Sequence, residues 1–163
     1  MMEIQLLLTV MRTNRSLIRF DVDRNTLPEN AQINKVILTL YNVDPIPHRY
    51  EGELTPESSS ERWYGAVLQR IIEPWEEYRV TWDNQPKTTR ENQVYITPFN
   101  SADRYADIDV TRLYLPENSV DRPHYGMFFR HYLSELFPGF RFASSDYPDR
   151  RMHPELKIYY TLN

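Results

Sequence analysis

Short runs of alternating apolar and polar residues recur along this chain, and they constrain its fold more than any other feature. The clearest run extends from Ile33 to Val43, where apolar residues at every second position define one face. A period of two, rich in β-branched and aromatic residues, indicates a half-buried β-strand. Further strands are predicted at Ile4–Val10, Arg15–Val22, Tyr64–Ile72, Val80–Trp82, Ala106–Val110, Tyr125–Tyr132, Phe140–Ala143 and Leu156–Leu162.

Turn signals separate these strands every 8–15 residues, and helical patterning is weak. One helical turn is predicted at Thr111–Leu115, and loops are predicted at 44–60 and 84–92. The 163 residues suit one domain, since domains hold about 100–200 residues. We therefore expect an all-β fold, a single antiparallel β-sandwich of jelly-roll type over residues 1–163, with long Pro/Ser-rich loops and little helix.

Composition excludes several classes of function. Cysteine is absent, which excludes disulfides, thiolate metal sites and cysteine nucleophiles. The net charge of −4 is a poor match for a nucleic-acid binder, which usually carries a basic stripe. The longest wholly apolar run, at residues 6–8, is far below the roughly 20 residues of a membrane span, and no signal peptide is visible. We expect no nucleic-acid partner and no membrane span.

One set of residues suggests a binding surface. Arg15 and Arg19 share the outward face of their strand, and Lys157 and Tyr159 share the outward face of the last strand. If those strands are neighbours, a basic and aromatic surface results, and guanidinium groups suit carboxylates such as those of a uronic-acid glycan. The competing interpretation is an ordinary solvated face, in which Asp21 neutralises an arginine.

The tryptophans have two interpretations as well. Trp75 and Trp82 are predicted to belong to the core, because large aromatic residues dominate the cores of β-sandwiches. In the alternative, they are platforms on which the C–H face of a sugar ring packs. Trp63, which follows a polar loop, suits either a buried or an accessible position.

Two acidic residues suggest a metal site as one alternative. Asp107 and Asp109 lie on one side of a predicted strand, so both carboxylates could bind one Ca²⁺ ion. We expect no required cofactor. The acids at positions 73, 76 and 77 could serve a glycosidase, but spacing alone does not show the necessary pair. No histidine pair, nucleophile elbow, phosphate loop or dinucleotide fingerprint is present in the sequence.

An ordered set of motifs resembles the DNRLRE family, β-sandwich modules related to the disaggregatase repeat and to alginate-type carbohydrate-binding modules. The most specific part is the block Trp75–Pro86, with the sequence WEEYRVTWDNQP. The resemblance runs from about Arg15 to Tyr160, and the family's first strand is not matched. Its other parts are RSLIRFDV at 15–22, LP at 27–28, AQI at 31–33, LTLY at 38–41, IDVT at 108–111, YG at 125–126, FASS at 142–145 and HPELKIYY at 153–160.

The resemblance implies a non-catalytic accessory module in a secreted or surface protein that binds a polysaccharide, with acidic ones among the candidates. A parent multidomain surface protein is implied too. An alternative is a structural or adhesive spacer, or a protein-interaction module of a surface or phage-type assembly. A polysaccharide-degrading enzyme is a third interpretation. The predicted ligand-binding residues are Arg15, Arg19, Tyr41, Lys157 and Tyr159.

Overall fold

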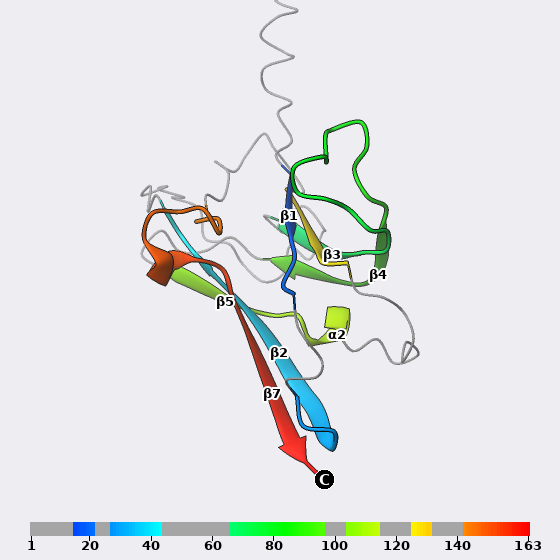
Figure 1. The fold of residues 1–163 in the computed structure, drawn as a ribbon, viewed down its shortest axis with the longest axis vertical. Coiled ribbons are helices and arrows are strands. Elements are labelled where there is room, and N and C mark those ends of the chain that lie inside the picture. Colours follow the sequence, from blue (N-terminus) through cyan, green and yellow to red (C-terminus); the bar gives the residue numbers. More distant parts are fainter. Residues whose placement is uncertain (1–14, 22–26, 44–65, 97–103, 115–124, 132–141) are drawn as a thin grey trace, which may run out of the picture.

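The computed structural model describes residues 15–21, 27–43, 66–96, 104–114, 125–131 and 142–163. Within them the regular secondary structure is almost wholly β-strand (Figure 1). The strands are β1 (Arg15–Ile18), β2 (Ala31–Tyr41), β3 (Ala66–Ile71), β4 (Thr88–Ile96), β5 (Tyr105–Asp109), β6 (Met127–His131) and β7 (Glu155–Leu162). The short helices are α2 (Thr111–Tyr114) and the 3₁₀ turn η3 (Arg150–Met152).

The strands form two antiparallel sheets. One has four strands in the order β1-β6-β3-β4, and the other has three in the order β5-β2-β7. Their inner faces meet in one apolar cluster, to which β2 contributes Val36, Leu38 and Leu40, and the larger sheet Leu68 and Phe129. The predicted all-β sandwich is therefore confirmed, while the jelly-roll connectivity stays a prediction.

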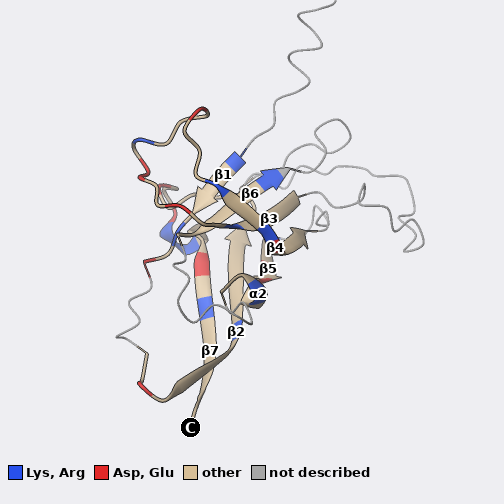
Figure 2. Ribbon diagram, turned by 90° about the vertical axis from the view of Figure 1, so that its right-hand side faces the viewer, with Lys and Arg blue, Asp and Glu red and all other residues tan. Residues whose placement is uncertain are grey.

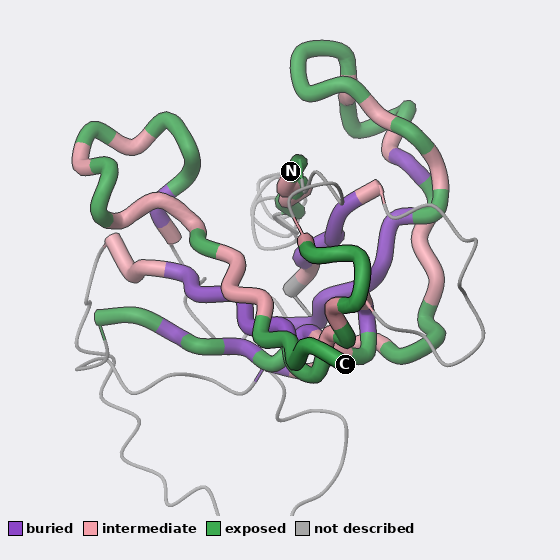
Figure 3. The backbone as a smooth tube through the Cα atoms, turned by 60° about the horizontal axis from the view of Figure 1, so that its bottom comes forward, coloured by how far each residue is buried: buried purple, intermediate pink, exposed green. Residues whose placement is uncertain are grey.

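Burial follows from this layering. All six residues of β3 are buried, since it lies between two neighbours in its sheet. The outward residues Ile37 and Thr39 of β2 are also only 9% and 1% exposed, because β2 is the central strand and the side chains of β5 and β7 flank them. Figure 3 shows buried stretches in the middle of the strands and exposed ones in the loops and at the C-terminus.

One turn joins sheet and helix. The hydroxyl of Thr111 accepts a hydrogen bond from the backbone N–H of Val36, and it donates to Asp109 Oδ1 at 2.5 Å. This confirms the predicted helical turn, which the structure places at Thr111–Tyr114. In the part of the chain that the structure describes, no helix is long and apolar enough to cross a membrane.

Four sequence predictions differ from the structure. Residues 80–82 are not a strand; they belong to a tight turn. The predicted loop at 84–92 ends early, because β4 begins at Thr88 and pairs with β3. The strand predicted at Arg15–Val22 ends at Ile18, and of Phe140–Ala143 the described part forms only an isolated bridge between Phe142 and Asn42. The strand at 4–10, the loop at 44–60 and Trp63 lie outside the described residues.

Candidate functional site

The segment that resembles the DNRLRE block is a loop between β3 and β4, closed at its base. The backbone N–H of Ile72 donates to the carbonyl of Lys87 at 3.0 Å, and the Lys87 ammonium lies 2.6 Å from a Glu73 carboxylate oxygen. That hydrogen bond lowers the pKa of Glu73 and raises the pKa of Lys87 from their ordinary values. The two ends of the loop are thereby held together at the edge of the sheet.

Inside the loop, a single asparagine organises the turn. Asn84 accepts from both the backbone N–H and the hydroxyl of Thr81, and its amide donates to the carbonyl of Arg79 at 2.9 Å. Asn side chains favour such local bonds over strand pairing, which explains why residues 80–82 form no strand. Gln85 adds a bond from its amide to the carbonyl of Trp82 at 2.7 Å.

Two arginine–tryptophan stacks attach this loop to β1. The guanidinium carbon of Arg15 lies 4.2 Å from the ring centroid of Trp82, and that of Arg19 lies 5.0 Å from the ring centroid of Trp75. Arg15 also donates to Gln85 Oε1 at 2.7 Å, and Arg19 donates to the Trp75 carbonyl at 3.0 Å. Cation–π contacts of this kind are attractive because the aromatic face is negative. The loop is therefore attached to Arg15 at the start of β1 and to Arg19 just after it.

This attachment gives the predicted arginines a role within the fold. Arg19 also lies 3.4 Å from Asp21, which is the neutralised arrangement that the sequence left open. The prediction that Trp82 is a core residue is wrong: it is 58% exposed, because it packs on a guanidinium at the surface. Trp75 is half-buried, and its indole N–H donates to the Tyr125 carbonyl at 2.7 Å.

The other predicted ligand-binding residues lie on the second sheet. Tyr41 is on β2, and Lys157 and Tyr159 are on β7, so the structure does not join them to Arg15 and Arg19, which lie at β1 and just after it. The three do share one outward face. Tyr41 pairs with Tyr105 of β5, and their ring centroids are 6.0 Å apart.

Rows of paired residues cross this outward face of β5-β2-β7. After the tyrosine row, Thr39 lies between Asp107 and Glu155, Ile37 lies between Asp109 and Lys157, and Lys35 lies beside Tyr159. Partners in register project their side chains to the same side. We call this outward surface the tyrosine track. It consists of Lys35, Tyr41, Tyr105, Asp107, Asp109, Glu155, Lys157 and Tyr159.

Opposite charges lie side by side on the track. The Lys157 ammonium is 3.3 Å from Glu155 Oε2, and this hydrogen bond raises the pKa of Lys157. Asp107 Oδ1 accepts a 2.5 Å hydrogen bond from the buried hydroxyl of Thr39. In the ribbon of Figure 2, both acidic and basic residues occur along β7. The track is a polar and aromatic surface without a single dominant sign of charge.

Asp107 and Asp109 share the track, as expected from their strand, but each has an oxygen committed to a threonine. Asp109 Oδ1 accepts from the N–H and hydroxyl of Thr111, and the hydroxyl bond lowers the pKa of Asp109. Calcium takes six to eight oxygen ligands. Among the described residues no group of three acidic or histidine side chains could hold a metal ion. A Ca²⁺ site here stays a prediction.

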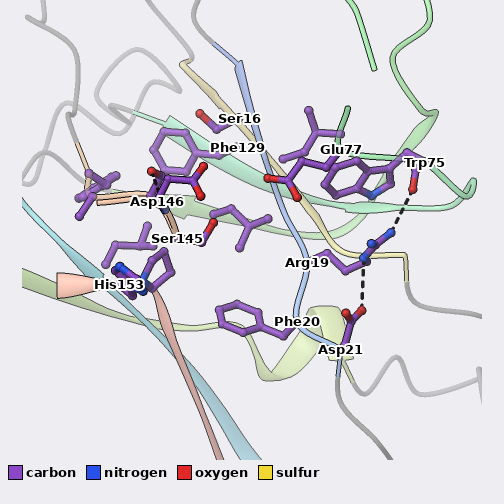
Figure 4. A pocket seen from close by; sticks show the side chains of 17 residues that line it. Ser16, Arg19, Phe20, Asp21, Trp75, Glu77, Phe129, Ser145, Asp146 and His153 are labelled. Atoms are coloured by element: carbon purple, nitrogen blue, oxygen red, sulfur yellow. Dashed lines mark hydrogen bonds and ion pairs between the residues drawn. The ribbon is translucent and has the colours of Figure 1, made fainter. Parts of the chain in front are cut away.

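A cavity of about 750 Å³ opens between the two sheets, on the β1 side. Its floor is apolar and comes from the core, with Leu40, Phe129 and Phe142. Its rim carries polar side chains from β1, from the loop after β3 and from residues 144–154 (Figure 4). This cavity could not be predicted from local sequence pattern, because its walls come from segments far apart in the chain.

Comparison with known proteins finds no matching family model, no matching curated protein and no matching solved structure. The resemblance to the DNRLRE family thus stays a prediction that rests on the motifs alone.

Proposed function

We propose that the protein is a non-catalytic carbohydrate-binding module of a secreted or surface protein, and that it binds an extended polysaccharide along the tyrosine track. The observation that carries this proposal is the Tyr41–Tyr105 ring pair on an open sheet face, with Tyr105 55% exposed. Sugar rings pack their C–H faces on aromatic planes, and neighbouring carboxylate and ammonium groups hydrogen-bond to hydroxyls.

The length of the track supports a chain as the ligand. Tyr159, 52% exposed, lies beside Lys35, and Lys35 is six residues from Tyr41 along β2. At about 3.3 Å per residue, the two aromatic ends are roughly 20 Å apart. An extended polymer can touch both ends at once, whereas a single sugar cannot.

The charges on the track favour a neutral polysaccharide over an acidic one. Three carboxylates, Asp107, Asp109 and Glu155, face two ammonium groups, Lys35 and Lys157. Arg15 and Arg19, which suit carboxylate ligands, are stacked on tryptophans elsewhere. We therefore propose a neutral polymer as the preferred ligand.

Affinity electrophoresis through gels that contain neutral or uronic-acid polysaccharides tests this proposal. We expect a neutral polymer to retard the protein, and Tyr41→Ala combined with Tyr105→Ala to abolish the retardation. Tyr78→Ala is the matched control, because Tyr78 is 94% exposed but lies on the loop after β3. Retardation that survives the double substitution, or that requires a uronic-acid polymer, would contradict the proposal.

The alternative is a structural or adhesive module without glycan binding. The two arginine–tryptophan stacks favour it, because they use the predicted arginines to hold the fold together. In that case no polysaccharide retards the folded protein, and the same gels distinguish the two functions.

A further inference from the structure

The cavity between the sheets combines an apolar floor with carboxylates at its rim. Phe20, Leu40 and Phe129 line its inner part. Glu77 comes from the loop after β3 and Asp146 from the segment before η3, so the two acids stand on different walls. Figure 4 shows both carboxylates directed into the space between these walls.

The charged groups of the rim are mostly carboxylates: Asp21, Glu77 and Asp146. Arg19 is the guanidinium among the described lining residues, and it donates to the Trp75 carbonyl and lies 3.4 Å from Asp21. His153 Nε2 lies 2.8 Å from the Tyr147 carbonyl oxygen, which only accepts, so this ring nitrogen donates to it. A positively charged group on a ligand would therefore complement the carboxylates of Glu77 and Asp146.

The volume fits a small molecule. Ligand pockets measure about 300–1,000 Å³ and are largely apolar, with a few polar groups that fix orientation. At about 750 Å³, this cavity lies within that range. An apolar body would displace water from the aromatic floor, while a charged head would stay at the rim, where carboxylates can each accept a charge-assisted hydrogen bond.

We propose that this cavity is a binding site for small organic cations, with a primary ammonium group held between Glu77 and Asp146 and an apolar body packed over Phe20 and Phe129. The site is independent of the tyrosine track, which lies on the outward face of the other sheet. The proposal therefore stands or falls separately from carbohydrate binding.

Three probes of similar size and different charge test the site: phenethylamine, 2-phenylethanol and 3-phenylpropionate. Binding is followed by calorimetry and by the NMR shift of the Trp75 indole N–H, which a Trp75→Phe variant assigns. We expect the ammonium probe to bind at least about tenfold more tightly than the alcohol, and the carboxylate not to bind. Equal binding of all three probes, or none by the folded protein at millimolar concentration, overturns the proposal.

Two substitutions locate the ammonium group. Glu77→Gln and Asp146→Asn each remove a negative charge with little change of shape, and both residues are exposed, so the fold should tolerate them. Each should weaken phenethylamine binding about three- to tenfold and leave 2-phenylethanol binding unchanged. Asp83→Asn, an exposed acid of the same loop that does not line the cavity, is the matched control. Undiminished phenethylamine binding by the double variant would place the ammonium elsewhere and overturn the assignment.

A comparison of glucosamine with phenethylamine tests whether the apolar body of the ligand contributes to binding. It carries the charge on a polar body that gains nothing from the aromatic floor, so we expect it to bind at least about tenfold more weakly than phenethylamine. Equal affinity for both amines would show that the floor contributes nothing and would contradict the proposed ligand class.

Discussion

The central carbon of the Arg15 guanidinium lies 4.2 Å from the ring centroid of Trp82, although the two residues come from the first described strand and a distant loop. Arg15 also contacts the ring of Phe128 on the neighbouring strand at 5.8 Å. The guanidinium thus lies near one ring of the loop and one ring of the sheet, and its charge is attracted to both.

A double-mutant cycle on Arg15→Ala and Trp82→Ala should give a coupling free energy of about 0.5–1 kcal/mol, the size of a cation–π contact at an exposed site. Urea unfolding of the four proteins measures it. Arg90→Ala, which removes an exposed arginine from β4, serves as the control and should change stability by less than about 0.5 kcal/mol. Strict additivity of the two substitutions would show that the stack contributes nothing.

Gly126, directly before β6, should not tolerate a side chain. Its φ of +111° lies in a region that favours glycine, and a Cβ atom there would be 2.5 Å from the carbonyl oxygen of Ile18. We expect Gly126→Ala to lower the free energy of unfolding by at least about 1–3 kcal/mol. Thermal unfolding measures the change, and an unaltered midpoint would contradict the close approach of this turn to β1.

Substitution of two leucines, one buried and one exposed, tests the layering of the sheets. Leu68 is fully buried between the sheets, so Leu68→Ala should cost about 2–5 kcal/mol, through lost transfer free energy and the cavity left behind. Leu162 on β7 is 61% exposed, and Leu162→Ala should stay within about 0.5 kcal/mol. Denaturant unfolding compares them. Similar effects of the two substitutions would contradict the layering of the sheets.

Asp109 predicts part of the acid sensitivity. The hydrogen bond from the Thr111 hydroxyl lowers its pKa in the folded state, so this contribution is present above the unfolded value of about 3.9 and is lost as the pH falls through the folded pKa. Below about pH 4, the free energy of unfolding should therefore change less steeply with pH in Asp109→Asn than in the unsubstituted protein. The difference in slope corresponds to a fraction of one bound proton. Asp83→Asn is the control, and equal slopes for the two variants would argue against the Asp109–Thr111 bond.

The sequence pattern alone predicted the strands in which apolar and polar residues alternate clearly. The run that contains β2 shows it, since its apolar positions 36, 38 and 40 do face the core. The first half of β4, which reads Thr-Thr-Arg-Glu-Asn, has no apolar period and was predicted as a loop. It is a strand because β3 offers partners, including Gln69, whose side-chain oxygen accepts from the Thr88 hydroxyl at 2.9 Å.

The period of two also predicted only some properties of the candidate site residues. The period of two placed Lys157 and Tyr159 on one outward face, and it placed Arg15 and Arg19 on another. It did not reveal that the two faces belong to different sheets. Trp82 was expected in the core because it follows Val80 and Thr81, a strand-like context that the Asn84 turn overrides.

The class of fold and the side to which each residue of a regular strand points therefore follow from local sequence, because both depend on neighbours two positions away. Local sequence does not specify which strands adjoin, which arginine meets which tryptophan, or where the cavity opens. Those outcomes depend on contacts between distant segments, whose free energies are settled only when the two sheets pack together.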